Sequence, residues 1–286
     1  MNRIVLGVDA GNHMAKVVGP FGTDIFRTNI CDWFEREVEE TFGADDMEFL
    51  IDGRKGFAGA IAMFEDEFGN GSMYGDTKVH DDNKIRVLLA VNRYLDKYCS
   101  NVGKVSIVTG QPIIRHKDSE KDAIKKMLTG NHEVKVNGKT RSFTIDNVGV
   151  APEGSAAYWA KPSVGLVRIL DIGSGTVNAA TIIDNKHINN ASTTFNFGVE
   201  TVKDKNDMTS IARGVIRSTT KLKWGKSDKL LICGGIAEGI APRIIEHFNN
   251  GEIIYPTLRC GNEVEMLSPV YANAIGYYEI AKGAFA

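Results

Sequence analysis

Two stretches decide the fold of this chain: GVDAGNHMAKVV at residues 7–18 and LDIGSGTVNAAT at residues 170–181. Each contains an apolar segment, typical of a buried strand, that leads into Asp-x-Gly. A turn and a second apolar segment follow, so each stretch predicts a β-hairpin. Asp9 and Asp171 hold the same place in the two stretches, which lie in opposite halves of the chain. An internal repeat of this kind is stronger evidence than a single motif.

The turns of these hairpins have the chemistry of an anion site. Backbone N–H groups that converge in a tight turn form a nest for anions, and a neighbouring carboxylate can hold hydrated Mg²⁺. Lys16 adds a positive charge to the first hairpin. Taken alone, this hairpin also fits an ordinary turn with a solvated Asp9 and Lys16. With the second copy, the pattern favours two hairpins that hold one polyphosphate from both sides, with two aspartates directed at one metal ion.

The overall composition limits the class of protein. The chain has 286 residues, 43% hydrophobic and 24% charged, with a net charge of −2, as expected for one large or two modest globular domains. This balance gives no electrostatic reason for direct binding to nucleic acid. The four cysteines form no CxxC pair and no signal peptide is evident, which predicts reduced thiols and a cytoplasmic protein. No apolar run is long enough to span a bilayer, so we expect no membrane partner.

The remaining pattern predicts alternating strands and helices. Strands are expected at 4–9, 15–18, 104–112 and 229–235, and hairpins turn at Asp52-Gly53 and Asn137-Gly138. Helices are expected at 83–98, 118–129 and 208–222, from about 238, and at 268–284. A further helix is expected at 152–159, which would place Glu153 in its first turn.

Five segments, in order, resemble the motifs of the actin-like ATPases, within the superfamily of actin, sugar kinases and chaperone ATPases. They correspond to the first phosphate loop, first connecting motif, second phosphate loop, adenosine motif and second connecting motif: residues 7–16, 108–112 (VTGQP), 171–178, 231–239 (LICGGIAEG) and 269–276 (PVYANAIG). The resemblance spans nearly the whole chain. It is closest to the bacterial plasmid-segregation actins of the ParM and AlfA kind, whose Pro-Glu segment is similar to PEGSAA at 152–157.

This resemblance implies an α/β, two-lobed actin-like fold with duplicated mixed β-sheets flanked by helices. The first lobe would span 1–150, with a small subdomain at about 30–100, and a C-terminal helix at about 269–286 would pack back on it. The second lobe would span 151–268. Only about sixty residues separate Asp171 from Gly234. The second small subdomain (IIB) is therefore expected to be reduced or absent, as in AlfA-like proteins, which leaves one wall of the adenine pocket unaccounted for.

The resemblance also implies roles for individual residues. Asp9 and Asp171 would hold hydrated Mg²⁺, and Glu153, with Asp171 as the second catalytic residue, would orient or deprotonate the attacking water. The residues expected to bind ATP or GTP are Asp9, Gly11, Asn12, His13, Lys16, Gly173, Ser174, Gly175, Thr176, Gly234 and Gly235. The two last glycines would let the backbone approach the nucleoside.

The implied function is a nucleotide-dependent, filament-forming ATPase that segregates plasmid DNA. Its partners would be further copies of itself, head to tail, and a DNA-binding adaptor protein, with centromere-like plasmid DNA bound only indirectly. Three alternatives remain. A small-molecule kinase needs an acidic base, which the sequence does not identify, and an iron–sulfur activator ATPase needs converging cysteines, which the spacing does not require. The third is a nucleotide-binding sensor without hydrolysis.

Overall fold

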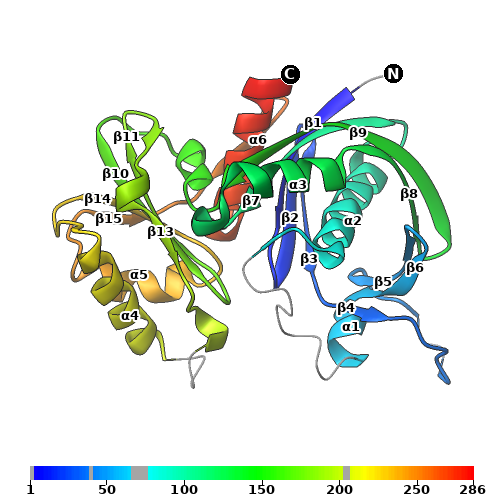
Figure 1. Cartoon of the computed structure of the whole chain (residues 1–286), viewed down its shortest axis with the longest axis horizontal. Helices are drawn as coiled ribbons and strands as arrows, with labels where there is room; N and C mark the ends of the chain where they lie inside the picture. Colours follow the sequence, from blue (N-terminus) through cyan, green and yellow to red (C-terminus); the bar gives the residue numbers. More distant parts are fainter. Residues whose placement is uncertain (1–2, 39–40, 66–76, 202–206) are drawn as a thin grey trace. The chain divides into compact units, whose positions relative to one another are not determined.

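The computed structural model describes residues 3–38, 41–65, 77–201 and 207–286. The chain divides into two compact units, which can be followed by colour in Figure 1. Unit 1 comprises Met1–Thr109, Ser119–Val150 and Ala281–Ala286, and unit 2 comprises Gly110–Asp118 and Ala151–Ile280. Among the described residues, no helix is both long enough and apolar enough to cross a membrane.

Unit 1 is built on a mixed nine-stranded sheet with the strand order β3-β2-β1-β7-β9-β8-β5-β6-β4. Its strands are β1 (Arg3–Ala10), β2 (Met14–Gly19), β3 (Gly22–Arg27), β4 (Ile30–Asp32), β5 (Asp46–Ile51), β6 (Arg54–Gly59), β7 (Lys104–Gln111), β8 (Gly130–Val136) and β9 (Lys139–Pro152). The helices that accompany it are α1 (Ala60–Glu65), α2 (Asp81–Tyr98) and α3 (Asp118–Leu128). Strand β1 pairs antiparallel with β2 and parallel with β7. The predicted hairpins at Asp52-Gly53 and Asn137-Gly138 are confirmed as β5–β6 and β8–β9.

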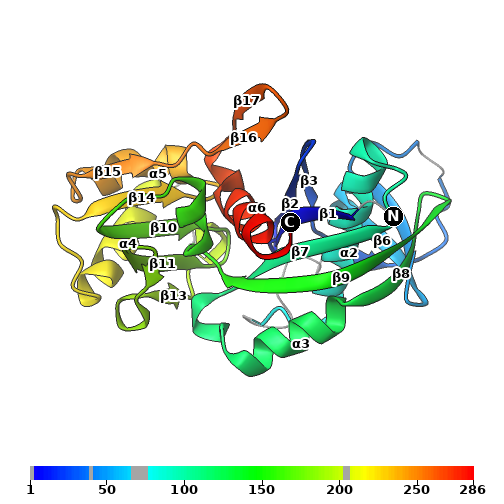
Figure 2. The same ribbon diagram turned by 90° about the horizontal axis from the view of Figure 1, so that it is seen from above.

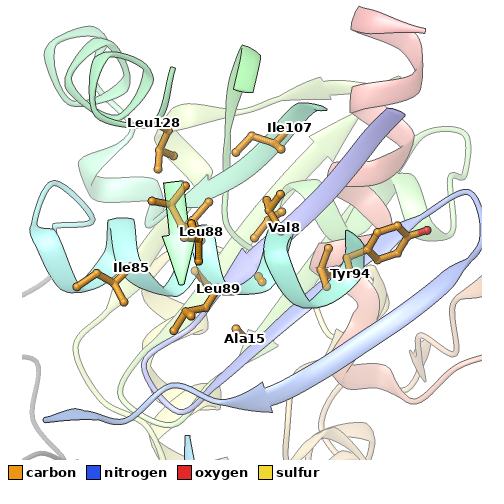
Figure 3. Packing of buried hydrophobic residues seen from close by; sticks show 14 of the residues in the cluster. Val8, Ala15, Ile85, Leu88, Leu89, Tyr94, Ile107 and Leu128 are labelled. Atoms are coloured by element: carbon orange, nitrogen blue, oxygen red, sulfur yellow. The ribbon is translucent and has the colours of Figure 1, made fainter. Parts of the chain in front are cut away.

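The core of unit 1 lies between this sheet and α2. Figure 3 shows Val8 and Ala15 of the first hairpin near Leu88 and Leu89 of α2, all fully buried in one apolar cluster. Full burial of a leucine side chain is worth about 1.5 to 3 kcal/mol. Because side chains alternate along a strand, Asp9 follows Val8 on the opposite face of the sheet. The core therefore fixes where the first hairpin presents its carboxylate.

Unit 2 is built on a smaller mixed sheet with the order β12-β11-β10-β14-β15, to which β13 adds by pairing with β11 (Figure 2). Its strands are β10 (Leu166–Ile172), β11 (Val177–Ile183), β12 (Lys186–His187), β13 (Thr193–Phe195), β14 (Lys229–Cys233) and β15 (Gly251–Ile253), and β16 (Thr257–Cys260) and β17 (Glu263–Met266) form a separate hairpin. The helices are α4 (Met208–Lys221), α5 (Ala237–Ile245) and α6 (Ala272–Phe285), which runs on into unit 1. Between β11 and β14, the described residues add two short strands to the same sheet and α4, as expected if subdomain IIB is reduced.

Strand β10 separates two apolar layers of unit 2. Leu170 and Ile172 pack in the cluster that includes α4 and α5 residues, whereas Val167 and Ile169 pack on the other face. The second cluster includes Tyr158 from a 3₁₀ turn and Ala272, the first residue of α6. Asp171 continues the Val167–Ile169 series by the two-residue period of a strand. This period directs its carboxylate toward the side of the sheet that carries the 3₁₀ turn and the start of α6.

The predicted helix at 152–159 is wrong. Strand β9 runs to Pro152, and a single 3₁₀ turn follows a short bend. The N–H of Glu153 donates to the carbonyl of Gln111 at 2.9 Å, and Gly154 has a φ of +73°, which an α-helix does not accommodate. The five 3₁₀ turns of the described chain are η1 (Ile113–Arg115), η2 (Ala156–Ala160), η3 (Asn189–Ala191), η4 (Val199–Thr201) and η5 (Pro269–Tyr271). The last of these replaces the predicted start of the C-terminal helix.

Candidate functional site

The first hairpin, β1–β2, carries a buried ion pair. Asp9 and Lys16 are register partners, so their side chains share one face of the sheet. Lys16 Nζ lies 3.0 Å from Asp9 Oδ2, and each residue is only 8% exposed. The alternative of an ordinary turn with a solvated aspartate and lysine is therefore wrong. Four residues, 11–14, connect the last register pair, Ala10 and Ala15.

Two further cations contact this hairpin from outside its sequence. Lys78 Nζ donates to the carbonyl of Ala10 at 2.9 Å, and Arg86 Nη1 donates to Asn12 Oδ1 at 3.3 Å. Both are only 8% exposed. The positive charge has an electrostatic effect on its neighbour His80, whose pKa is lowered to about 4 by burial and by the charges of Arg86 and Lys78.

The second hairpin, β10–β11, repeats the geometry of the first with different chemistry. Asp171 and Asn178 are register partners, and four residues, 173–176, again connect the last pair, Ile172 and Val177. The turn is closed by the N–H of Gly173, which donates to the carbonyl of Thr176 at 2.9 Å. The predicted turn residues Ser174 and Gly175 lie within it.

Asp171 and Glu153 are joined by one amide. Asn178 Nδ2 lies 3.2 Å from Asp171 Oδ2 and 3.3 Å from Glu153 Oε2. The hydroxyl of Thr194 donates to Asn178 Oδ1 at 2.7 Å, which fixes the orientation of the amide. Asn273 Nδ2 also donates to Asp171 Oδ2, at 2.9 Å. The structure thus brings the two predicted catalytic carboxylates together.

The backbone of the Glu153 turn is held as firmly as its side chain. Asn273 Oδ1 accepts the N–H of Gly154 at 2.9 Å, so one asparagine ties this turn to Asp171. A Cβ on Gly154 would lie 2.8 Å from Asn178 Cβ, so the close approach requires glycine. These contacts place Glu153 by backbone and by side chain at once.

A histidine lies beside the same turn. Ser155 Oγ is 3.0 Å from His187 Nδ1, and Ser155 is buried. Burial lowers the pKa of His187, and the charge of His116 lowers it further. His187 is therefore a neutral neighbour of the Glu153 turn at neutral pH.

Gly234 and Gly235, which follow β14, differ in whether the surrounding structure would accept a side chain. Gly234 has a φ of +101°, and a Cβ there would lie 2.3 Å from the carbonyl oxygen of Ile172. Its glycine is thus explained by close packing against the end of β10. A Cβ on Gly235 would meet nothing within 4 Å. The approach of a nucleoside to these glycines stays a prediction.

The predicted site residues are assembled within each unit separately. Unit 1 holds Asp9, Gly11, Asn12, His13 and Lys16 on one hairpin. Unit 2 holds the rest, which are Glu153, Asp171, Gly173, Ser174, Gly175, Thr176, Gly234 and Gly235. That the two sets face one another across a cleft stays a prediction.

Sequence reasoning missed four residues of these two assemblies: Lys78, Arg86, Asn178 and Asn273. Asn178 had a signal, because it stands seven positions after Asp171, as Lys16 does after Asp9. Asn273 lies inside the second connecting motif, but its partner is 102 positions away. Lys78 and Arg86 lie in the stretch 76–95, whose sequence is similar to the helix entry of ParM-type actins, but that likeness assigned neither of them a contact with the first hairpin.

The family can now be stated. Residues 7–155, just over half of the chain, match the model of the N-terminal domain of actin-like proteins. The chain belongs to the actin-like protein family. No curated protein sequence matches it.

Solved structures extend the similarity of fold to both units. The chain is similar to apo pSK41 ParM (TM-score 0.75, 16% identity, 99% of this chain and 98% of that one). It is similar to an AlfA filament bound to AMPPNP (TM-score 0.75, 18% identity, 99% of each chain). A third likeness is to the archaeal actin homologue Ta0583 with ADP (TM-score 0.70, 18% identity, 98% of this chain and 100% of that one). The predicted actin-like fold is confirmed.

Proposed function

We propose that this protein binds a nucleoside triphosphate, assembles into head-to-tail filaments and hydrolyses the nucleotide. The observation that carries the proposal is the pair of carboxylates, Glu153 and Asp171, that share the amide of Asn178 at the turn of the second hairpin. In this arrangement Glu153 would position the attacking water, and Asp171 beside it would attract the metal ion.

The two hairpins would bind the polyphosphate. Backbone N–H groups in the connection 11–14 and of residues 174–176 are suited to phosphate oxygens, while the Gly173 N–H closes the second turn by donating to Thr176. Lys16 supplies a buried positive charge to the first of them. The nucleotides in two similar structures, AMPPNP in the AlfA filament and ADP in Ta0583, support a nucleotide as the ligand. We propose that the predicted residues of both connections contact the phosphates and that Gly234 and Gly235 contact the nucleoside.

The donor set also fits Mg²⁺, which usually keeps several waters and is held by one or two carboxylates and by phosphate oxygens. Asp171 is the better ligand of the two predicted aspartates. Its Oδ2 atom accepts hydrogen bonds from the amides of Asn178 and Asn273, whereas Asp9 Oδ2 forms an ion pair with Lys16. When bound, the ion would neutralise charge that develops on the phosphate oxygens.

Hydrolysis would rely on Glu153 to place a water molecule. The water oxygen attacks the γ-phosphorus while the bond from that phosphorus to the β–γ bridging oxygen breaks, and the water proton passes to the Glu153 carboxylate or to solvent. The products are a nucleoside diphosphate and inorganic phosphate. Asn178 keeps Glu153 close to Asp171, so positioning contributes more than covalent chemistry does.

The filament would act on plasmid DNA through another protein. A net charge of −2 gives little non-specific attraction to DNA phosphates. We therefore assign the DNA contact to a separate basic adaptor that recognises a centromere-like site. Repeated adaptor sites along a filament would strengthen weak contacts by avidity.

Phosphate release and electron microscopy test this proposal together. We expect Glu153→Ala and Asp171→Ala to slow nucleotide-dependent phosphate release on the order of a hundredfold or more, with nucleotide binding and filament assembly largely retained. Glu263→Ala is the matched control, because Glu263 is an exposed glutamate of unit 2 on β17. Unchanged turnover in Glu153→Ala would move the water-positioning role to another residue.

The rival functions predict different products. Phosphate transferred to a small molecule in place of water would identify a kinase, and binding without turnover would identify a sensor. Visible absorbance after anaerobic purification would identify an iron–sulfur activator. Tight, salt-sensitive retention of plasmid DNA by the protein alone, near physiological salt, would contradict the need for an adaptor.

A further inference from the structure

The start of α2 brings two buried cationic side chains to the first hairpin. Lys78 lies three residues before the helix and Arg86 lies in its second turn. Lys78 Nζ donates to the Ala10 carbonyl at 2.9 Å, and Arg86 Nη1 donates to Asn12 Oδ1 at 3.3 Å. Neither residue belongs to a motif that the proposed function uses.

The contact between Lys78 and the Ala10 carbonyl orients the whole peptide unit between Ala10 and Gly11. The carbonyl of Ala10 and the N–H of Gly11 belong to one planar peptide unit, in which they point in opposite directions. An ammonium group that holds the carbonyl on one side therefore directs the Gly11 N–H to the other side. Gly11 is the first residue of the connection between the two strands. Lys78 thus sets the orientation of the first N–H that the connection can offer to an anion.

Arg86 holds the same connection at two points. Its Nε donates to the Thr28 carbonyl at 3.0 Å, and the Thr28 N–H donates to the His13 carbonyl at 3.2 Å. Its Nη1 reaches Asn12. A planar guanidinium holds both acceptors with a rigid fork of donors, whereas an ammonium group is a compact charge on a flexible stem. The consecutive residues Asn12 and His13 are therefore held by one side chain, directly and through Thr28.

Both cations are anchored on a rigid support. Asn83 Nδ2 donates to the Lys78 carbonyl at 2.8 Å, and the Asn83 N–H donates to His80 Nδ1 at 3.2 Å as the N-cap of α2. The helix itself packs into the core of unit 1 through Leu88 and Leu89. Burial lowers the pKa of His80 most, and the charges of Arg86 and Lys78 lower it further.

We propose that Lys78 and Arg86 are positioning residues for phosphate binding, because they hold the backbone of the first hairpin in the conformation that receives an anion. This inference rests on the proposed function and adds the start of α2 to the nucleotide site. A connection held in advance loses less conformational freedom when a ligand binds.

Loss of Lys78 or Arg86 should therefore weaken binding of the phosphates and leave binding of the nucleoside unchanged. A nucleoside without phosphates makes no use of the 11–14 connection, so its affinity should not depend on either cation. A nucleoside triphosphate uses this connection both before and during the reaction. Loss of a positioning residue should therefore raise Kd and KM, and change kcat much less.

Titration calorimetry with a nucleoside and its triphosphate, in the presence of Mg²⁺, tests this inference on the full chain. We expect Lys78→Gln and Arg86→Gln to raise the Kd of the triphosphate about tenfold or more and to leave the Kd of the nucleoside unchanged. Lys78→Arg should restore most of the affinity. Arg93→Gln is the matched control, since Arg93 lies on the same helix but pairs with Asp24 at 2.6 Å.

Arg86→Lys keeps the charge and loses the fork, and it keeps the test informative if a glutamine variant fails to fold. It should weaken triphosphate binding relative to wild type. Equal triphosphate affinity in wild type, Arg86→Lys and Lys78→Gln would overturn the inference. Equal losses for nucleoside and triphosphate would also overturn it, because they would indicate a general structural role. Failure of the wild-type protein to bind any nucleotide would instead overturn the proposed function.

Discussion

The two hairpins share one backbone plan and differ in their electrostatics. Each has a register pair seven positions apart, which is Asp9 with Lys16 in the first and Asp171 with Asn178 in the second. The first carboxylate meets a buried ammonium group at 3.0 Å, whereas the second meets amide groups at 3.2 and 2.9 Å. The same spacing thus places one carboxylate beside an ammonium group and the other beside two amide groups, and we propose that the first hairpin serves phosphate and the second a cation.

The residues that hold the two hairpins in place also differ in charge. Two charged side chains hold the first hairpin: Lys78, just before α2, and Arg86, within α2. Neutral groups hold the second, with the Asn273 amide at the carboxylate and Gly234 packed against Ile172. Two hairpins with the same Asp-x-Gly pattern can therefore have different electrostatic environments. The following substitutions test this contrast.

The largest effect on stability is expected from removal of the Lys16 charge. Lys16→Met leaves the buried carboxylate of Asp9 without its cation, which should lower the free energy of unfolding by about 3 to 5 kcal/mol. Urea denaturation measures the change. The double variant with Asp9→Asn should recover most of the loss. A loss below about 1 kcal/mol in the single variant would indicate that the pair behaves as a solvated one.

Substitutions of the two glycines after β14 should distinguish a role in packing from a role in nucleotide contact. Gly234→Ala imposes an unfavourable φ and a collision with the Ile172 carbonyl, so we expect a loss of roughly 2 to 3 kcal/mol in unfolding free energy. Gly235→Ala has open space and should change stability by less than about 0.5 kcal/mol. If the nucleoside approaches there, Gly235→Ala should still weaken nucleotide binding. Equal stabilities of the two variants would contradict the packing role of Gly234.

A smaller loss is expected from Asn178→Ala in the second hairpin. It removes amide-to-carboxylate hydrogen bonds at Asp171 and Glu153 but no buried counter-ion, so the free energy of unfolding should fall by about 1.5 to 2 kcal/mol. Combination with Asn273→Ala should give a non-additive loss, since both amides serve one carboxylate oxygen. A loss as large as that of Lys16→Met would remove the contrast between the hairpins.

A pH-dependent effect is expected at the support of the first hairpin. The pKa of His80 is lowered from 6.5 to about 4, chiefly by burial and then by Arg86 and Lys78, against the opposite effect of Asp82 and Asp81. Between these pH values the folded protein binds fewer protons than the unfolded chain, so stability falls as the pH falls. Protonation also removes the acceptor that caps α2, a contribution of about 1 kcal/mol.

His80→Asn keeps a capping side chain and does not titrate. Its unfolding free energy should therefore depend less on pH than that of the wild type between pH 6.5 and 4, as measured by urea denaturation at several pH values. The same slope in both proteins would show that His80 does not titrate in this window.

The sequence predicted the hairpins and their aspartates because both depend on local pattern. Alternating apolar residues and Asp-x-Gly turns define β1–β2 and β10–β11 without reference to the rest of the chain. The helices α2, α3 and α4 were predicted within a few residues for the same reason. The contrast between Lys16 and Asn178 could also have been found by aligning the two repeats.

The supports could not be predicted, because they depend on contacts between distant segments. Lys78 and Ala10 are 68 positions apart, and Asn273 and Asp171 are 102 apart. Pro152 and Glu153 suit the first turn of a helix, yet the long-range hydrogen bond from the Glu153 N–H to Gln111 holds this segment in a turn. Short strands such as β12 and β13 are defined by pairing with β11 and have too few residues to show a period.

The central claim is that the two hairpins hold the phosphates of one nucleotide. A high-resolution structure of the protein with Mg²⁺ and a non-hydrolysable triphosphate tests it most directly. We expect phosphate oxygens within hydrogen-bonding distance of Lys16 Nζ and of backbone N–H groups in the 173–176 connection, with Asp171 directed at the cation. Phosphates that contact only one hairpin, with the other turned away from the nucleotide, would contradict it.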